Sequence, residues 1–224
     1  MRIEGGTKTI LVMMVLWIPL SSQAFGQEKS ALTAEQAWER LKKGNEKFVA
    51  DKSAAQDVGA ERRRELAKGQ HPFAIVLTCA DSRVAPEYIF NQGLGDIFVL
   101  RVAGNIADPF VLGSMEYALE HLHAPLVVVL GHTQCGAVEA ALGEHKPAGN
   151  LGKLIEDVYV GQDLPKERAA ALRAAIQNNV RHHADLLTKR SEVVKEFVEH
   201  KKARIVSGVY SLSTGKVEWL EGDE

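Results

Sequence analysis

The chain has 224 residues, of which 46% are hydrophobic and 25% are charged, and its formal net charge is −2 at pH 7. A chain of this length can bury a sizeable core. The near-neutral balance gives no reason to expect a nucleic acid or an anionic membrane as a partner.

The first 26 residues have the pattern of a secretory signal peptide. Two basic residues precede an apolar run at 10–20, and small residues follow up to Gly26. The apolar run is too short for a comfortable membrane span, although an uncleaved N-terminal anchor remains the alternative. We expect cleavage after Ala24 or Gly26. The remainder, 27–224, is predicted to be one secreted or periplasmic domain that has no membrane segment and a net charge of −3.

The remaining chain alternates between helical and strand patterns. A capping box at Thr33 and Gln36 predicts a first helix, which Gly44-Asn45 is expected to bend or interrupt. The later helices are predicted at 60–68, 86–90, 109–122, 137–142, within 143–164, 165–187 and 192–200. The strands are predicted at 73–78, 96–101, 126–130, 205–212 and 217–220.

This order predicts an α/β fold with a central, mostly parallel sheet flanked by helices. The last two strands are expected to form an antiparallel hairpin at one edge, and the first helix an N-terminal arm. The runs at 73–78 and 126–130 are continuously apolar, which is typical of strands buried on both faces.

Four polar side chains follow these two buried strands. Cys79 and Asp81 come after the first, and His132 and Cys135 come after the second. Ligands of parallel sheets collect at the carboxyl ends of the strands. Two thiolates, an imidazole and a carboxylate converging there suit Zn²⁺, which prefers four tetrahedral ligands. A disulfide between the only two cysteines is the alternative, since a secreted protein folds in an oxidising compartment.

The motifs CADSRVAPEYIF, GLGDIFVLRVAGN and GHTQCGAV occur in this order and together resemble those of the beta-class carbonic anhydrases. The resemblance runs from about Leu41 to the last strand. The commoner family form has Ser directly after the first cysteine, whereas this chain has Ala80. That position flanks the ligands, so we expect little effect.

The resemblance implies one Zn²⁺ per chain, bound by Cys79, His132 and Cys135. Asp81 and Arg83 would form a catalytic dyad, with Asp81 as a fourth zinc ligand in a closed state. The implied substrate-binding residues are Gln70, Phe98, Tyr117 and Gly136, of which Phe98 and Tyr117 would come from the neighbouring subunit. The implied assembly is therefore a homodimer or homotetramer. Val76 replaces a tryptophan found in bicarbonate-gated members, which favours the ungated type.

The implied activity is the reversible hydration of carbon dioxide to bicarbonate and a proton by a zinc-bound hydroxide. Two thiolate ligands should acidify the bound water less than three histidines would, so activity is expected to rise on the alkaline side of neutral. The alternatives are a zinc hydrolase of carbonyl sulfide or carbon disulfide, and a secreted zinc-binding protein without turnover. The seven other histidines are candidate proton shuttles, each interpreted as a surface or helix-face residue: His71, His121, His123, His145, His182, His183 and His200.

Overall fold

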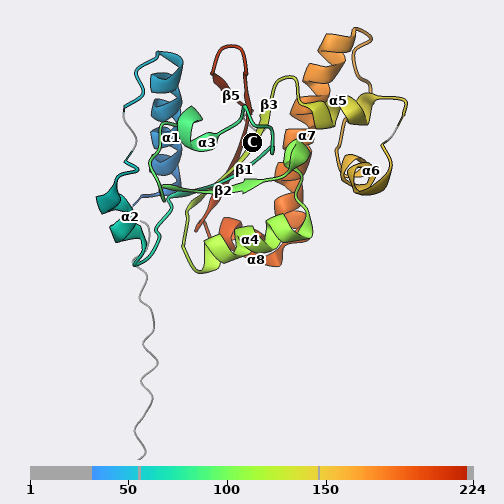
Figure 1. The fold of residues 1–224 in the computed structure, drawn as a ribbon. Coiled ribbons are helices and arrows are strands. Elements are labelled where there is room, and N and C mark those ends of the chain that lie inside the picture. The colour runs from blue at the N-terminus through green and yellow to red at the C-terminus, as the bar shows by residue number, and fades with distance from the viewer. Residues whose placement is uncertain (1–31, 55–56, 146, 221–224) are drawn as a thin grey trace, which may run out of the picture.

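Figure 1 shows the protein as a computed structural model, which describes residues 32–54, 57–145 and 147–220. The predicted signal peptide at 1–26 lies outside these ranges. Within them, every helix is too short or too polar to cross a bilayer.

A five-stranded sheet forms the centre, in the order β2-β1-β3-β4-β5. Its strands are β1 (Ala74–Thr78), β2 (Ile97–Arg101), β3 (Leu126–His132), β4 (Arg204–Tyr210) and β5 (Val217–Trp219). All neighbouring pairs are parallel except β4 and β5, which are antiparallel. The predicted fold class and its edge hairpin are therefore confirmed.

Helices cover both faces of the sheet (Figure 1). They are α1 (Ala34–Val49), α2 (Ala60–Leu66), α3 (Pro86–Ile89), the 3₁₀ turn η1 (Ala103–Asn105), α4 (Pro109–Glu120), α5 (Gly136–Leu142), α6 (Gly149–Glu156), α7 (Arg168–Arg190) and α8 (Glu192–Glu199). One core lies between the sheet and α4 to α8, and a second lies between the sheet and α1 and α3.

The central strands supply both cores at once. In β1, Ile75 and Leu77 face the first core, while Ala74 and Val76 face the second. Successive side chains of a strand point to opposite faces, so a strand covered on both sides must be apolar throughout. This explains why the sequence of β1 is apolar from Ala74 to Leu77 rather than alternating between apolar and polar residues.

The first helix keeps its predicted capping box at Thr33, but it is not interrupted at Gly44-Asn45. A Cβ at Gly44 would lie 1.8 Å from the carbonyl oxygen of Phe90, so the glycine permits close backbone contact with α3. The Asn45 amide donates to the carbonyls of Ile89 and Gly215. Both residues therefore serve packing within one continuous helix.

The long helix α7 begins and ends later than predicted. The expected start at Pro165 is wrong because the Glu167 side chain caps the helix by accepting from the N–H groups of Ala169 and Ala170. Its end at Arg190 lies three residues beyond the predicted Leu187. A mixture of apolar and polar residues on this helix is buried, including Asn179 and His183.

Candidate metal centre

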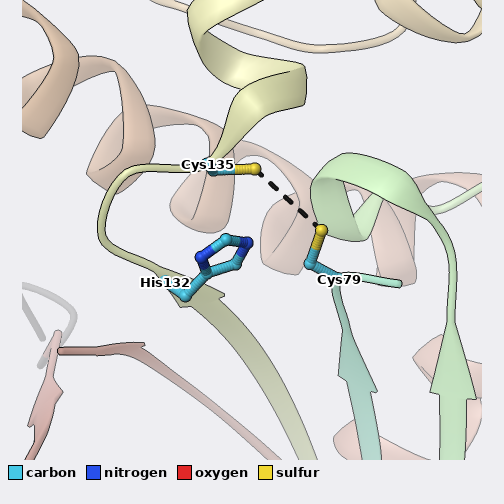
Figure 2. A group of neighbouring side chains, drawn as sticks. All are labelled: Cys79, His132 and Cys135. Atoms are coloured by element: carbon cyan, nitrogen blue, oxygen red, sulfur yellow. Dashed lines mark hydrogen bonds between the residues drawn. The ribbon is translucent and has the colours of Figure 1, made fainter. Parts of the chain in front are cut away.

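Cys79, His132 and Cys135 meet at the carboxyl ends of β1 and β3, as Figure 2 shows. Cys79 follows the last residue of β1, His132 is the last residue of β3, and Cys135 is the N-cap of α5. Since β1 and β3 are parallel neighbours, their carboxyl ends lie side by side. The three ligand atoms lie within 4.8 Å of one another, and all three residues are buried.

The turn after β3 brings Cys135 back towards Cys79. Gln134 adopts a positive φ of 55° within a turn at 133–134 that leads from β3 to Cys135. Thr133 fixes this turn to the end of β4, because its N–H donates to the Tyr210 carbonyl at 2.9 Å. Its hydroxyl oxygen also accepts from the N–H of Leu212 at 3.0 Å. The His-x-x-Cys spacing thus places the side chains of His132 and Cys135 together, near Cys79.

The separation of the two sulfurs fits a shared metal ion. The Sγ atoms of Cys79 and Cys135 are 4.0 Å apart, and both cysteines are free. Two thiolates at about 2.3 Å from a tetrahedral zinc would be about 3.8 Å apart. A disulfide would require about 2.0 Å, so the disulfide alternative is not the arrangement that the structure has.

His132 presents one ring nitrogen to this cluster. Its Nδ1 lies 2.9 Å from the carbonyl oxygen of Thr133, which places the proton on Nδ1. The Nε2 atom is buried and has no hydrogen-bond partner among the described residues. An imidazole nitrogen without a proton or a hydrogen-bond partner, buried beside two sulfurs, is in the tautomer that could donate to a metal ion.

The two thiols are electrostatically coupled. Hydrogen bonding from Cys135 lowers the pKa of Cys79 to about 4, even though burial opposes the shift. The same contact, together with burial, raises the pKa of Cys135 well above its ordinary value. A divalent cation bound between the two sulfurs would stabilise both thiolates, because it offsets the repulsion between two adjacent negative charges.

Asp81 and Arg83 form a bidentate ion pair beside the cluster. Arg83 Nε donates to Asp81 Oδ1 at 2.9 Å, and Nη2 donates to Oδ2 at 2.7 Å. These bonds hold the pKa of Asp81 well below its usual range. Oδ2 lies 3.9 Å from His132 Nε2. The carboxylate therefore lies next to the cluster, and Arg83 holds it in place.

Two further residues act on the Cys79–Asp81 loop, and neither was singled out from the sequence. Arg101, the last residue of β2, donates through Nη2 to the Asp81 carbonyl at 2.7 Å and through Nε to the Cys79 carbonyl at 3.3 Å. The N–H of Gly104 donates to the Cys79 sulfur at 3.4 Å. Both residues lie in the motif GLGDIFVLRVAGN, which was quoted for its family resemblance and not for a role of either residue.

The predicted substrate residues are divided between two places. Gly136 opens α5 next to Cys135, and a Cβ there would meet no heavy atom within 4 Å. Phe98 and Tyr117 contact each other, with ring centroids 6.5 Å apart. Phe98 pairs in register with Ile75, which is about 13 Å along β1 from Cys79.

Gln70 lies before the amino end of β1, and Cys79 follows its carboxyl end. Gln70, Phe98 and Tyr117 therefore lie away from the metal donors of their own chain. Tyr117 is 47% exposed, so its ring is accessible to another molecule.

The chain is similar to known proteins of one family. Residues 74–217 match the family model described as carbonic anhydrase. The chain is 41% identical over 185 residues to "Carbonic anhydrase 2" of Mycobacterium tuberculosis, covering 80% of this chain and 89% of that protein. It is 40% identical over 190 residues to a carbonic anhydrase of Mycolicibacterium smegmatis, covering 81% and 91%.

Solved structures extend the comparison to the fold. The Coccomyxa beta-carbonic anhydrase, solved in complex with acetazolamide, superimposes with a TM-score of 0.67 at 31% identity. The match covers 80% of this chain and 83% of that one.

Proposed function

Because this chain belongs to the beta-class carbonic anhydrase family, we propose that it catalyses the zinc-dependent, reversible hydration of carbon dioxide to bicarbonate and a proton. The observation that carries the proposal is the convergence of three buried metal donors beside an Asp–Arg pair. Cys79, His132 and Cys135 would hold one Zn²⁺ per chain, leaving a fourth position free of protein ligands. The ion would supply a Lewis acid that lowers the pKa of a coordinated water.

Asp81 would orient the attacking oxygen. Its Oδ1 accepts two hydrogen bonds, from the N–H and Nε of Arg83, whereas Oδ2 accepts one and faces the site. The remaining lone pair of Oδ2 could accept a hydrogen bond from a proton-bearing oxygen at the fourth position. Since Arg83 keeps the carboxylate ionised, Asp81 acts only as an acceptor and directs the free lone pair of that oxygen towards carbon dioxide.

A second copy of the chain would complete the substrate pocket. Phe98 lies on β2 in register with Ile75, about 13 Å along β1 from Cys79, and Tyr117 is its neighbour, so neither is placed to line the site of its own chain. By its resemblance to the family, we assign the apolar wall of each site to the partner subunit's Phe98 and Tyr117, and a substrate contact to Gln70. The N–H of Gly136 would receive an oxygen of bicarbonate. A homodimer is the smallest assembly that satisfies this arrangement, and a homotetramer would contain two such dimers.

The enzyme is proposed to act in the periplasm or outside the cell. This proposal depends on the signal-peptide pattern of 1–26, which would leave 27–224 as the mature domain. N-terminal sequencing of the protein isolated from the periplasm would test it. A protein that retains Met1 and stays with the cytoplasmic fraction would contradict it.

The activity is tested by stopped-flow hydration of carbon dioxide with a pH indicator. We expect fast turnover by the zinc-loaded protein, loss of turnover after chelation, and recovery when zinc is restored. A protein that binds zinc but does not hydrate carbon dioxide would refute the proposed reaction. Carbonyl sulfide and carbon disulfide would then be the next substrates to assay.

A further inference from the structure

Two buried polar side chains of α7 connect the metal centre to a second loop. Asn179 and His183 are one helical turn apart, and their exposed fractions are 0% and 1%. Buried polar side chains are costly unless they are hydrogen-bonded, and each of these uses both of its polar atoms. None of these bonds goes to another side chain, since all four partners are backbone groups of two loops.

Each side chain makes one bond to each loop. Asn179 Nδ2 donates to the Gly104 carbonyl at 2.7 Å, and its Oδ1 accepts from the Tyr159 N–H at 2.9 Å. His183 Nδ1 accepts from the Ala107 N–H at 3.1 Å, and Nε2 lies 3.1 Å from the Asp157 carbonyl. The two residues therefore fasten the 104–107 loop and the 157–159 loop to the same helix.

The bond from Asn179 ends next to a metal donor. Gly104, whose carbonyl Asn179 holds, donates its own N–H to the sulfur of Cys79 at 3.4 Å. Gly104 has a φ of 73°, and a Cβ there would lie 3.1 Å from Val158 Cγ2 and 3.3 Å from the Cβ of Ala137. The direction of the Gly104 N–H therefore depends on the backbone conformation of this glycine. The hydrogen bond from Asn179 to the Gly104 carbonyl helps to hold that conformation.

We propose that Asn179 is a positioning residue of the metal centre, which holds the Gly104 N–H on the Cys79 sulfur and so tunes that sulfur as a metal donor. A hydrogen bond to a ligating thiolate stabilises its negative charge, and outer-shell partners of this kind affect metal affinity. The inference rests on the proposed function, because it takes Cys79, His132 and Cys135 to be the zinc ligands.

The chain offers a matched control at the preceding residue. Asn178 lies on the same helix and donates through Nδ2 to the Val160 carbonyl at 3.1 Å. It thus holds Val160, next to the 157–159 loop, and within the described part of the chain it has no hydrogen bond to 104–107. Asn179→Ala and Asn178→Ala remove the same side chain from adjacent positions, and only the first should affect the sulfur. Asn179→Asp provides a second variant of nearly native volume that keeps an acceptor for Tyr159.

The experiment measures zinc affinity by competition with a chelator, together with the thiolate-to-cobalt charge-transfer band of the Co²⁺-substituted protein. We expect both Asn179 variants to lose roughly tenfold to a hundredfold in zinc affinity. The band should move to longer wavelength, because a sulfur without its N–H donor gives up electron density more easily. Asn178→Ala should keep the wild-type band and bind zinc within about twofold of the wild-type protein, since its loss leaves the sulfur untouched.

A purely structural role of Asn179 would destabilise the fold without moving the band. Asn179 variants with the band and the zinc affinity of Asn178→Ala would overturn the inference while leaving the proposed function intact. A wild-type protein that binds no zinc would overturn both the inference and the proposed function. Zinc binding by the wild-type protein is therefore measured before any variant is compared.

Discussion

Acidification should destabilise the protein through His183, which is locked in its neutral form. Its Nδ1 accepts from the Ala107 N–H, so a proton on Nδ1 would break that bond. Burial, helped by the neighbouring His182, lowers the pKa of His183 from 6.5 to about 4. The unfolded chain therefore binds this proton at a higher pH than the folded chain does.

The sign and size of the effect follow from that difference. His183 contributes its full stability above about pH 6.5, and the contribution is lost as the pH falls towards 4. One pKa unit corresponds to about 1.4 kcal/mol. The loss should therefore reach about 2 kcal/mol at pH 5 and about 3 kcal/mol at pH 4.

Urea unfolding followed by tryptophan fluorescence would measure this loss against His183→Gln. Glutamine keeps a donor and an acceptor but does not titrate in this range. Between pH 7 and pH 5 the wild-type protein should lose about 2 kcal/mol more than the variant. His71→Gln, at an exposed position, should behave like the wild type. Equal losses in the wild type and His183→Gln would refute the assignment.

Three other substitutions test the site and the packing. Asp81→Asn should keep zinc and lose about a hundredfold in turnover, as measured by stopped-flow and metal analysis; full turnover with normal zinc would exclude the orienting role. Arg83→Lys should lose about tenfold or more because one ammonium cannot replace the two-bond fork, and wild-type rates would contradict this. Gly44→Ala should lower the free energy of unfolding by about 1–3 kcal/mol through its clash with Phe90, whereas exposed Lys43→Ala in the same helix should change it by less than about 0.5 kcal/mol. Equal stabilities of the two helix variants would show that the clash is relieved at no cost.

The residues of the candidate metal centre could be found from the sequence because short motifs at strand ends carry them. The run 126–130 identified a buried strand, and the His-x-x-Cys spacing placed both donors just beyond it. Parallel pairing then brought Cys79 alongside, as the register confirms. Local pattern and sheet geometry were therefore sufficient for this part of the site.

The supporting residues could not be found in the same way, since they act through backbone groups distant in sequence. Asn179 reaches Gly104 across 75 residues, and no local pattern marks that pairing. His183 was interpreted as a surface or helix-face histidine; it does lie on a helix, but it is 1% exposed, so the surface interpretation is wrong. Hydrophobic periodicity locates the buried stripe of α7 but does not show which polar residues on it find partners.

X-ray absorption at the zinc edge of the purified protein tests the central claim most directly. The account predicts one zinc per chain, with two sulfur ligands at about 2.3 Å and two nitrogen or oxygen ligands at about 2.0–2.2 Å, from His132 and the open position. A zinc site without sulfur, or a protein without zinc whose Cys79 and Cys135 are oxidised, would contradict it.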